Sequence, residues 1–232
     1  MGEQIRSDTV AVSLFDVIGP VMVGPSSSHT AGAVRLGNIA RRICQTQPRR
    51  VEFYLHGSFA RTYLGHGTGK ALVGGILGLL PDDERLRDSY QLALQNGLEY
   101  AFFAEDLGDV HPNTVRIVSF IPGGSRSEMV GSSTGGGKVL VTRVNGMDVR
   151  FTGQYPTIIT RHQDQPGIVA HISGILAKHM INIAFLEVFR SARGGLASMV
   201  IETDQNVSPE IVQELTRLEG VQEVLFIDCS YI

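Results

Sequence analysis

The feature that most constrains the fold is a regular alternation of strand and helix patterns from residue 157 onward. Runs rich in β-branched residues alternate with runs whose apolar residues recur at helical spacing. Asp164-Gln165-Pro166-Gly167 makes a turn before the first helix, and Ser208 and Pro209 suit the N-cap and first position of the second. The expected elements are strands at 157–160, 181–189, 196–203 and 221–227, and helices at about 168–179 and 209–218. Their order, βαββαβ, is ferredoxin-like.

The chain before this alternation is rich in Gly, Ser and His, so we divide it near 152–156 into domains at residues 1–152 and 157–232. The first part predicts an α+β sandwich, with a hairpin turn at Asn145-Gly146. The strand order does not follow from the sequence. The expected elements are an apolar segment at 13–23, helices from about 31 to 43, 59 to 80 and 83 to 105, and strands at 51–55, 114–120, 138–144 and 147–151.

Composition excludes several classes of protein. Hydrophobic residues make up 43% of the 232, enough for ordinary cores, and the net charge of -3 disfavours nucleic-acid binding. The longest apolar run, 71–80, is shorter than the ~20 residues of a membrane helix, and charges within residues 1–17 disfavour a secretory signal. We therefore expect a cytoplasmic location. Two cysteines, Cys44 and Cys229, cannot by themselves hold a four-thiolate zinc or an iron–sulfur cluster, so no metal site is predicted in this chain.

The first candidate site is a run of hydroxyls immediately before the first helical pattern. It contains Ser26, Ser27, Ser28, His29 and Thr30. Hydroxyls and free backbone N–H groups at a helix start attract anions, including carboxylates. The alternative is ordinary N-capping by Ser27 or Ser28, which needs only one hydroxyl.

Histidines set among glycines form the second candidate site. His56-Gly57-Ser58 follows a predicted strand, and His66 lies within Gly65–Gly69. Imidazole titrates near neutral pH and transfers protons, and glycines leave room for a substrate. The alternative for each histidine is an ordinary core or surface position.

A third segment, 132–138, contains Gly136 and Gly137, and His111-Pro112-Asn113 precedes it. Its glycines permit close backbone approach, but the spacing is not that of a P-loop. Taken by itself, this segment is best interpreted as a flexible turn.

The second domain resembles an ACT domain, a small amino-acid-sensing module. The resemblance rests on Asp164-Gln165-Pro166-Gly167, the following helix and Ile181-Asn182-Ile183. It implies an effector site at Asp164, Gly167, Ile168, Ile181 and Asn182, where N–H groups at the helix start would bind a carboxylate and Asn182 would pair with both polar groups of an amino acid. The alternative is a plain turn in a module that serves only assembly.

The first domain resembles the β chain of bacterial iron–sulfur-dependent L-serine dehydratases. The residues that carry the resemblance are 15–32, including Pro25-Ser26-Ser27-Ser28-His29-Thr30, then His56-Gly57-Ser58, Gly65-His66-Gly67-Thr68, His111-Pro112-Asn113 and Gly135-Gly136-Gly137. The family usually has Asp after Gly-His-Gly-Thr, and this chain has Gly69, so no role of that Asp is carried over.

This resemblance implies a lyase that converts L-serine to pyruvate and ammonia. It implies a [4Fe–4S] cluster held by a separate α chain, with an open iron acting as Lewis acid on the substrate. His66 is then the favoured proton-transfer group and His29 the second. The residues expected to bind or surround the substrate are Ser26, Ser27, Ser28, Thr30, His56, Gly57, Ser58, His111, Asn113, Gly136 and Gly137.

Two other functions remain open at this point. The first domain is also similar to the allosteric substrate-binding domain of some phosphoglycerate dehydrogenases. On this alternative, the chain is a purely regulatory amino-acid sensor, and all catalytic groups lie on its partner. A pyridoxal-phosphate dehydratase needs a Schiff-base lysine, and none of Lys70, Lys138 and Lys178 lies in a recognisable cofactor motif. ACT modules often pair side by side, so we expect a homodimer contact through the ACT or the first domain.

Overall fold

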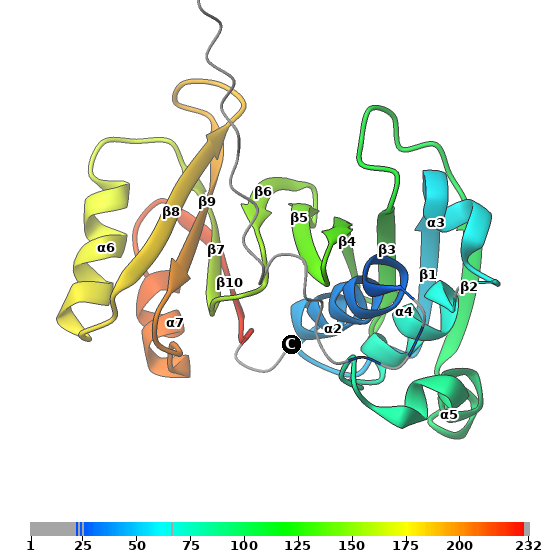
Figure 1. The fold of residues 1–232 in the computed structure, drawn as a ribbon. Coiled ribbons are helices and arrows are strands. Elements are labelled where there is room, and N and C mark those ends of the chain that lie inside the picture. The colour runs from blue at the N-terminus through cyan, green and yellow to red at the C-terminus, as the bar shows by residue number, and fades with distance from the viewer. Residues whose placement is uncertain (1–21, 23, 25, 66, 230–232) are drawn as a thin grey trace, which may run out of the picture.

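The computed structural model describes residues 22, 24, 26–65 and 67–229, so His66 and almost all of the apolar segment predicted at 13–23 lie outside the described residues. Two β-sheets stand side by side, each covered by helices on one face (Figure 1). One sheet has six strands and precedes residue 152, and the other has four and follows residue 156. The predicted combination of an α/β sandwich and a ferredoxin-like unit is confirmed, while the domain boundaries stay a prediction.

The six-stranded sheet is mixed. Its order is β2-β1-β3-β4-β5-β6, with β1 and β2 parallel and all other neighbours antiparallel. Asn145 and Gly146 join β5 to β6 with positive φ angles of 48° and 75°, which confirms the predicted hairpin turn. The strands are β1 (Arg50–Leu55), β2 (Glu99–Ala104), β3 (Thr114–Phe120), β4 (Arg126–Gly135), β5 (Lys138–Val144) and β6 (Met147–Phe151).

Helices α2 and α4 pack against one another and α2 covers β4. Their contact is close because glycines face each other: a Cβ at Gly37 would lie 2.9 Å from Gly75 Cα. The helical elements of this half are η1 (Ser27–Ala31), α2 (Gly32–Ile43), α3 (Gly57–Thr62), α4 (Thr68–Ile76), η2 (Glu84–Asp88) and α5 (Ser89–Gln95).

Two sequence predictions for this half are wrong, and one strand of the sheet has no counterpart among the predicted elements. The helix expected at 59–80 is two helices, because the chain leaves α3 after Thr62 and Gly67 adopts a left-handed φ of 75° before α4. The helix expected at 83–105 ends at Gln95, and its aromatic-rich end forms strand β2, which gains hydrogen bonds from β1. Strand β4 was not predicted, because its Ser and Gly residues lack a strand-like apolar pattern.

The four-stranded sheet follows the predicted βαββαβ order closely. Its strand order is β10-β7-β9-β8, with all neighbours antiparallel. Ser208 is the N-cap and Pro209 the first residue of the second helix, as expected. The elements are β7 (Thr157–Gln163), α6 (Ile168–Lys178), β8 (Ile183–Arg190), β9 (Leu196–Thr203), α7 (Pro209–Thr216) and β10 (Val221–Ile227).

The two halves share hydrophobic core. Ile158 and Ile201 face α6 and α7, whereas Ile159 and Val200 face the other way and belong to the core of the first half. This division follows from the two-residue period of strands, which sends neighbouring side chains to opposite faces. The four-stranded sheet is therefore partly covered on both faces.

Candidate active site

The predicted hydroxyl run folds into a single turn that surrounds His29. Ser26 is the N-cap of η1, and its Oγ accepts a hydrogen bond from the His29 N–H at 3.3 Å. His29 Nδ1 lies 3.1 Å from Ser28 Oγ and 3.3 Å from Ser26 Oγ. The capping residue is thus Ser26 rather than Ser27 or Ser28, and two of the hydroxyls contact the imidazole.

The other side of the imidazole faces the second motif. His29 Nε2 lies 3.1 Å from Ser58 Oγ, and the ring meets the edge of Phe59 at a centroid distance of 5.6 Å. The structure therefore brings together two motifs that are 29 residues apart in sequence. We call Ser26, Ser28, His29 and Ser58 the imidazole cradle.

The third motif lies directly against the second. Pro112 O accepts a hydrogen bond from Ser58 N at 2.8 Å. Gly57 has a φ of +53°, and a Cβ there would lie 2.7 Å from Pro112 O. Both the left-handed backbone and the close approach require glycine at this position. Gly57 thus brings 56–58 and 111–113 together.

His56 and His111 each make a local backbone contact. His56 Nδ1 accepts from Leu107 N at 3.2 Å and lies 3.6 Å from Asp106 Oδ1. His111 is exposed, and its Nδ1 accepts from Asn113 N at 3.1 Å. These bonds order the loops around β3, so both histidines have a structural role, and their contact with substrate stays a prediction.

Several buried polar atoms within the motifs singled out above have no hydrogen-bond partner among the described residues. They are Thr30 Oγ1, Asn113 Oδ1, Ser133 Oγ and Thr68 Oγ1. Ser133 N donates to Asn113 O at 3.0 Å, which joins two of these groups. A buried hydroxyl left without a partner costs about 1–3 kcal/mol, so such atoms indicate a site that water or a ligand completes.

Ser133 and Thr68 were not among the residues singled out from the sequence. Both belong to motifs that were recognised, but the sequence does not show which hydroxyls of a run are buried. Ser133 is fully buried on β4 and faces Gly32, where a Cβ would lie 2.7 Å from Ser133 Cβ. The absence of a side chain at Gly32 lets the start of α2 approach β4 closely.

Gly136 and Gly137 form the turn of the β4–β5 hairpin. Gly135 pairs with Lys138, and the two turn residues have φ angles of 57° and 76°. Gly137 O accepts a hydrogen bond from Arg35 Nη1 at 2.9 Å, so this turn is tied to α2. The positive φ angles explain why both positions are glycine. The contact of Gly136 and Gly137 with substrate stays a prediction.

The space beside Gly69 is filled by aromatic rings. A Cβ at Gly69 would collide with Tyr90 Oη and lie 3.2 Å from Phe102 Cζ. Burial raises the pKa of Tyr90 to about 12, so its hydroxyl stays protonated. An acidic side chain at position 69 therefore has no room in this chain while Tyr90 occupies the space.

The predicted effector residues lie at two ends of α6. Asp164 Oδ2 accepts from Gly194 N at 3.0 Å and from Arg190 Nη1 at 3.2 Å, which lowers the pKa of this carboxyl. Gly167 is the N-cap with a left-handed φ of 92°, and the Ile168 side chain is buried in the core.

The second group of effector residues follows the opposite end of this helix. Asn182 donates through Nδ2 to Asp204 Oδ2 at 2.5 Å, and its N–H donates to Gln205 Oε1 at 2.8 Å. Ile181 beside it is half-buried against the core. Since α6 has 11 residues and is about 16 Å long, one small amino acid does not reach both Asp164 and Asn182 within a chain.

No group of three or more His, Cys, Asp or Glu side chains among the described residues is placed to hold a metal ion. Cys44 and Cys229 are both free and buried. Burial raises the pKa of each thiol, that of Cys229 to about 12. Since a cluster needs several ligands and no such group surrounds either thiol among the described residues, these two cysteines do not suit a cluster.

None of the described helices is long and apolar enough to span a membrane. Comparison with known families matches residues 13–143 to the serine dehydratase beta chain and residues 157–220 to the ACT domain. The chain is 44% identical over 212 residues to the probable L-serine dehydratase beta chain of Bacillus subtilis (strain 168), covering 91% of this chain and 96% of the relative. It is 41% identical over 217 residues to the L-serine dehydratase beta chain of Peptoniphilus asaccharolyticus, covering 93% and 98%.

A shorter similarity concerns a dehydrogenase. The D-3-phosphoglycerate dehydrogenase of Bacillus subtilis (strain 168) is 34% identical over 91 residues, covering 38% of this chain and 17% of that protein. The first two relatives and the first family model extend over most of the six-stranded sheet and include all of the imidazole cradle. The chain therefore belongs to the serine dehydratase beta-chain family and carries an ACT domain at its second sheet.

Proposed function

We propose that this chain is the β subunit of an L-serine ammonia-lyase that converts L-serine to pyruvate and ammonia in the cytoplasm. The proposal includes an α chain that holds a [4Fe–4S] cluster. Two relatives named as L-serine dehydratase beta chains match over more than nine tenths of the chain. The observation that carries a catalytic role is the imidazole cradle, in which hydroxyls flank both nitrogens of His29.

The described residues do not fit an iron–sulfur cluster as ligands. Cys44 directly follows α2 and Cys229 follows β10; both thiols are buried, and no group of three His, Cys, Asp or Glu side chains among the described residues could hold a metal ion. We therefore assign the cluster to the α chain, where its open iron would supply Lewis-acid activation of the substrate hydroxyl.

The cradle suits a group that gains and loses a proton. A serine hydroxyl both donates and accepts, so Ser58 and Ser28 accommodate either protonation state of His29. The ring also rests against Phe59, which fixes its orientation. We propose that His29 Nε2 holds a proton beside the substrate. His66 keeps the proton-transfer role that its motif predicts.

Substrate binding falls to the unpartnered hydroxyls. Thr30, Ser133 and Thr68 are at least 95% buried, and each has an Oγ without a hydrogen-bond partner among the described residues. Each of these hydroxyl groups can donate a hydrogen bond to a carboxylate oxygen. We assign them to the carboxylate or hydroxyl of L-serine.

The test is co-expression with an α chain under anaerobic conditions, followed by serine-dependent pyruvate release for each chain alone and for both. His29→Ala and Ser58→Ala are expected to lower kcat, by about 100-fold or more for His29 if it transfers protons. His179→Ala is the matched control, because His179 pairs with Glu214 on the surface of the ACT domain. Turnover of His29→Ala within a few-fold of the unsubstituted protein would remove His29 from catalysis.

The second candidate function is a purely regulatory sensor. It is favoured by the match of residues 157–220 to an ACT domain and by the shorter similarity of the chain to a phosphoglycerate dehydrogenase. Saturable serine binding by this chain alone, together with unchanged turnover in the His29 and His66 variants, would support the sensor. A pyridoxal-phosphate enzyme is not favoured, since Lys70 donates to Arg87 O and Lys178 to Glu214 on the surface. Lys138 beside the glycine triplet is the only candidate lysine, and it lies in no recognisable cofactor motif.

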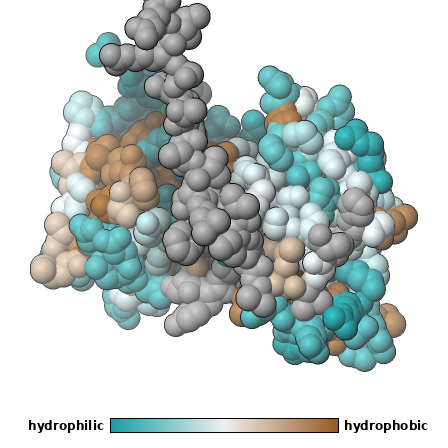
Figure 2. All heavy atoms as spheres, viewed as in Figure 1, coloured by the Kyte–Doolittle hydropathy of each residue, from teal (hydrophilic) through white to brown (hydrophobic). Residues whose placement is uncertain are grey.

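We also propose a homodimer formed through the ACT domain. Strand β8 is an edge of its sheet, and hydrophobic side chains gather over it in Figure 2. Phe185, Leu186 and Val188 are 58%, 38% and 38% exposed. An exposed apolar edge strand is a template for pairing with a second strand. Pairing would also bring effector residues from two copies together.

Light scattering during size-exclusion chromatography tests this contact. Leu186→Glu combined with Val188→Glu is expected to halve the measured mass. Leu94→Glu is the control, because Leu94 is 81% exposed and belongs to α5, which lies on the opposite side of the molecule from β8 (Figure 1). A dimer that survives the double substitution would place the contact elsewhere.

A further inference from the structure

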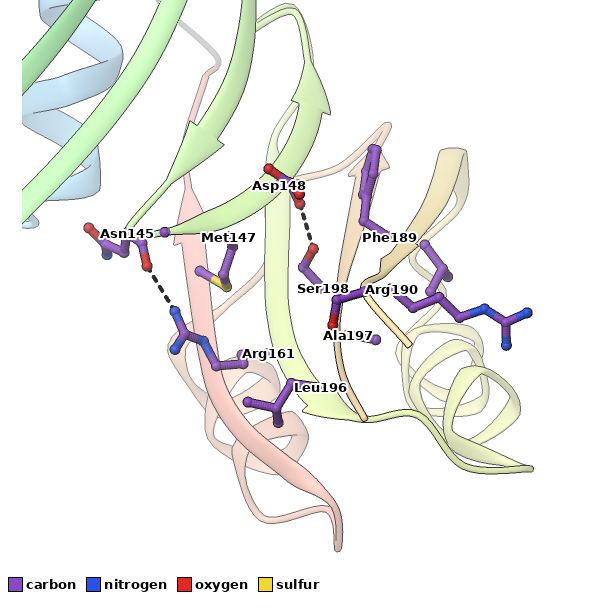
Figure 3. A pocket seen from close by; sticks show the side chains of 12 residues that line it. Asn145, Met147, Asp148, Arg161, Phe189, Arg190, Leu196, Ala197 and Ser198 are labelled. Carbon is purple, nitrogen blue, oxygen red and sulfur yellow. Dashed lines mark hydrogen bonds between the residues drawn. The ribbon is translucent and has the colours of Figure 1, made fainter. Parts of the chain in front are cut away.

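A cavity of about 580 Å³ lies at the junction of the two halves (Figure 3). One wall is the turn and start of β6, and the other is the face of the four-stranded sheet that points away from α6 and α7. Two hydrogen bonds connect the walls: Arg161 Nη2 donates to Asn145 O at 2.9 Å, and Ser198 Oγ donates to Asp148 O. The cavity is therefore built by both halves.

Opposite charges stand on the two walls. The Arg161 side chain is 33% exposed, and its Nε is buried without a hydrogen-bond acceptor among the described residues. Arg161 also forms a salt bridge with Glu223, whose Oε2 is 3.6 Å from that nitrogen. Because Nε is buried and Nη2 donates to Asn145 O, a ligand would meet the remaining N–H groups of the guanidinium. Asp148 presents a carboxylate that is 70% exposed, 3.5 Å from Arg143 Nε.

Apolar side chains also line the cavity. Met147 comes from β6, and Leu196 and Phe189 come from β9 and β8. Leu196 is the first residue of β9 and is 44% exposed, so its side chain presents apolar surface to the cavity. A ligand that covers it would remove apolar surface from water, which favours binding.

We propose that this cavity binds an α-amino acid with an apolar side chain. Its carboxylate would pair with Arg161, its ammonium group with Asp148, and its side chain would cover Leu196 and Phe189. Such a ligand contacts both halves at once, so it would fix the junction. The site is separate from the predicted effector loop: Arg190 lies at the cavity rim, but its guanidinium points away from the cavity and pairs with Asp164 (Figure 3). The proposal is independent of the proposed catalytic function.

Calorimetric titration of the full chain tests the site, with L-leucine and L-phenylalanine as probes. Saturable binding of at least one of them is expected. L-Leucinamide lacks the carboxylate and 4-methylpentanoate lacks the ammonium group, so each should bind at least about 10-fold more weakly than L-leucine. Equal affinity for L-leucine and both analogues would overturn the assignment of the two charges.

Variants locate the binding. Arg161→Met should weaken L-leucine binding at least about 10-fold, because it removes the guanidinium and keeps the apolar stem. Arg217→Met is the matched control and should leave the affinity unchanged, because Arg217 is exposed after α7 and does not line the cavity. Leu196→Trp fills the cavity while the Arg161–Asn145 bond remains, so it should also abolish binding even if Arg161→Met disturbs folding. Loss of binding in Arg190→Met with retention in Leu196→Trp would place the ligand at the effector loop and refute the proposal, as would no binding of either probe.

Discussion

Replacing Gly32 by Ala tests whether close contact between α2 and β4 shapes the site. The φ and ψ of Gly32 are -64° and -38°, so the backbone itself accepts alanine, and the helix would gain about 1 kcal/mol from the better propensity. The new Cβ would, however, collide with Ser133 Oγ and lie 2.7 Å from Ser133 Cβ. Overpacking of this kind costs about 1–3 kcal/mol, so the clash outweighs or cancels the gain in propensity.

Gly174→Ala in α6 is the matched control, because nothing lies within 4 Å of a Cβ there. It should stabilise by up to about 1 kcal/mol. The two alanine variants should therefore differ by about 1–3 kcal/mol, which corresponds to roughly 2–12 °C in Tm for a chain of this size.

Thermal unfolding followed by circular dichroism measures this difference. In a Ser133→Gly background the cost of Gly32→Ala should shrink by about 1–3 kcal/mol, because the colliding atoms are gone. Equal Tm shifts for Gly32→Ala and Gly174→Ala would refute the reasoning, since they would show that α2 moves away from β4 at no cost.

Three further results are expected. Burial lowers the pKa of His162 below 6.5, so the unfolded chain binds a proton at this residue more readily than the folded chain does. The free energy of unfolding should therefore fall as the pH drops from about 7 to 5. Urea titrations at pH 7 and pH 5 measure this fall, and it should be smaller in His162→Gln. Burial raises the pKa of Cys229 to about 12, so iodoacetamide at pH 8 should label it, by mass spectrometry, only after unfolding. Gly146→Ala forces alanine into a φ of 75° and should lower the free energy of unfolding by about 1–2 kcal/mol in urea titrations; no change would exclude the observed turn.

The second half was predictable because its signals are local. Apolar residues of α6 and α7 recur at helical spacing and its turns contain Pro or Gly, so the elements were found within a few residues of their observed bounds. Strand β2 was mistaken for helix because its aromatic residues fit either period, and only the hydrogen bonds from β1 decide between them. Strand β4 was missed because its stability comes from its neighbours β3 and β5 rather than from its own composition.

The candidate site was predictable as residue types but not as geometry. A run of hydroxyls before a helix indicates an anion site, whereas the contact of His29 with Ser58 depends on Gly57 fitting against Pro112. Which hydroxyls are buried depends on packing, so Ser133 became visible only where the start of α2 meets β4.

The shared core has a consequence for how the ACT domain can act on the rest of the chain. Ile159, Val200, Leu225 and Ile227 are at most 6% exposed and belong to the same cluster as the strands and helices of the first half. An ACT domain that shares its core with the first half does not rotate freely about a flexible linker. A protein truncated after residue 152 would expose part of this shared core to water and is expected to aggregate. The effect of an amino acid bound to the ACT domain would therefore reach the first half through small shifts of packed side chains, not through rotation of the whole ACT domain.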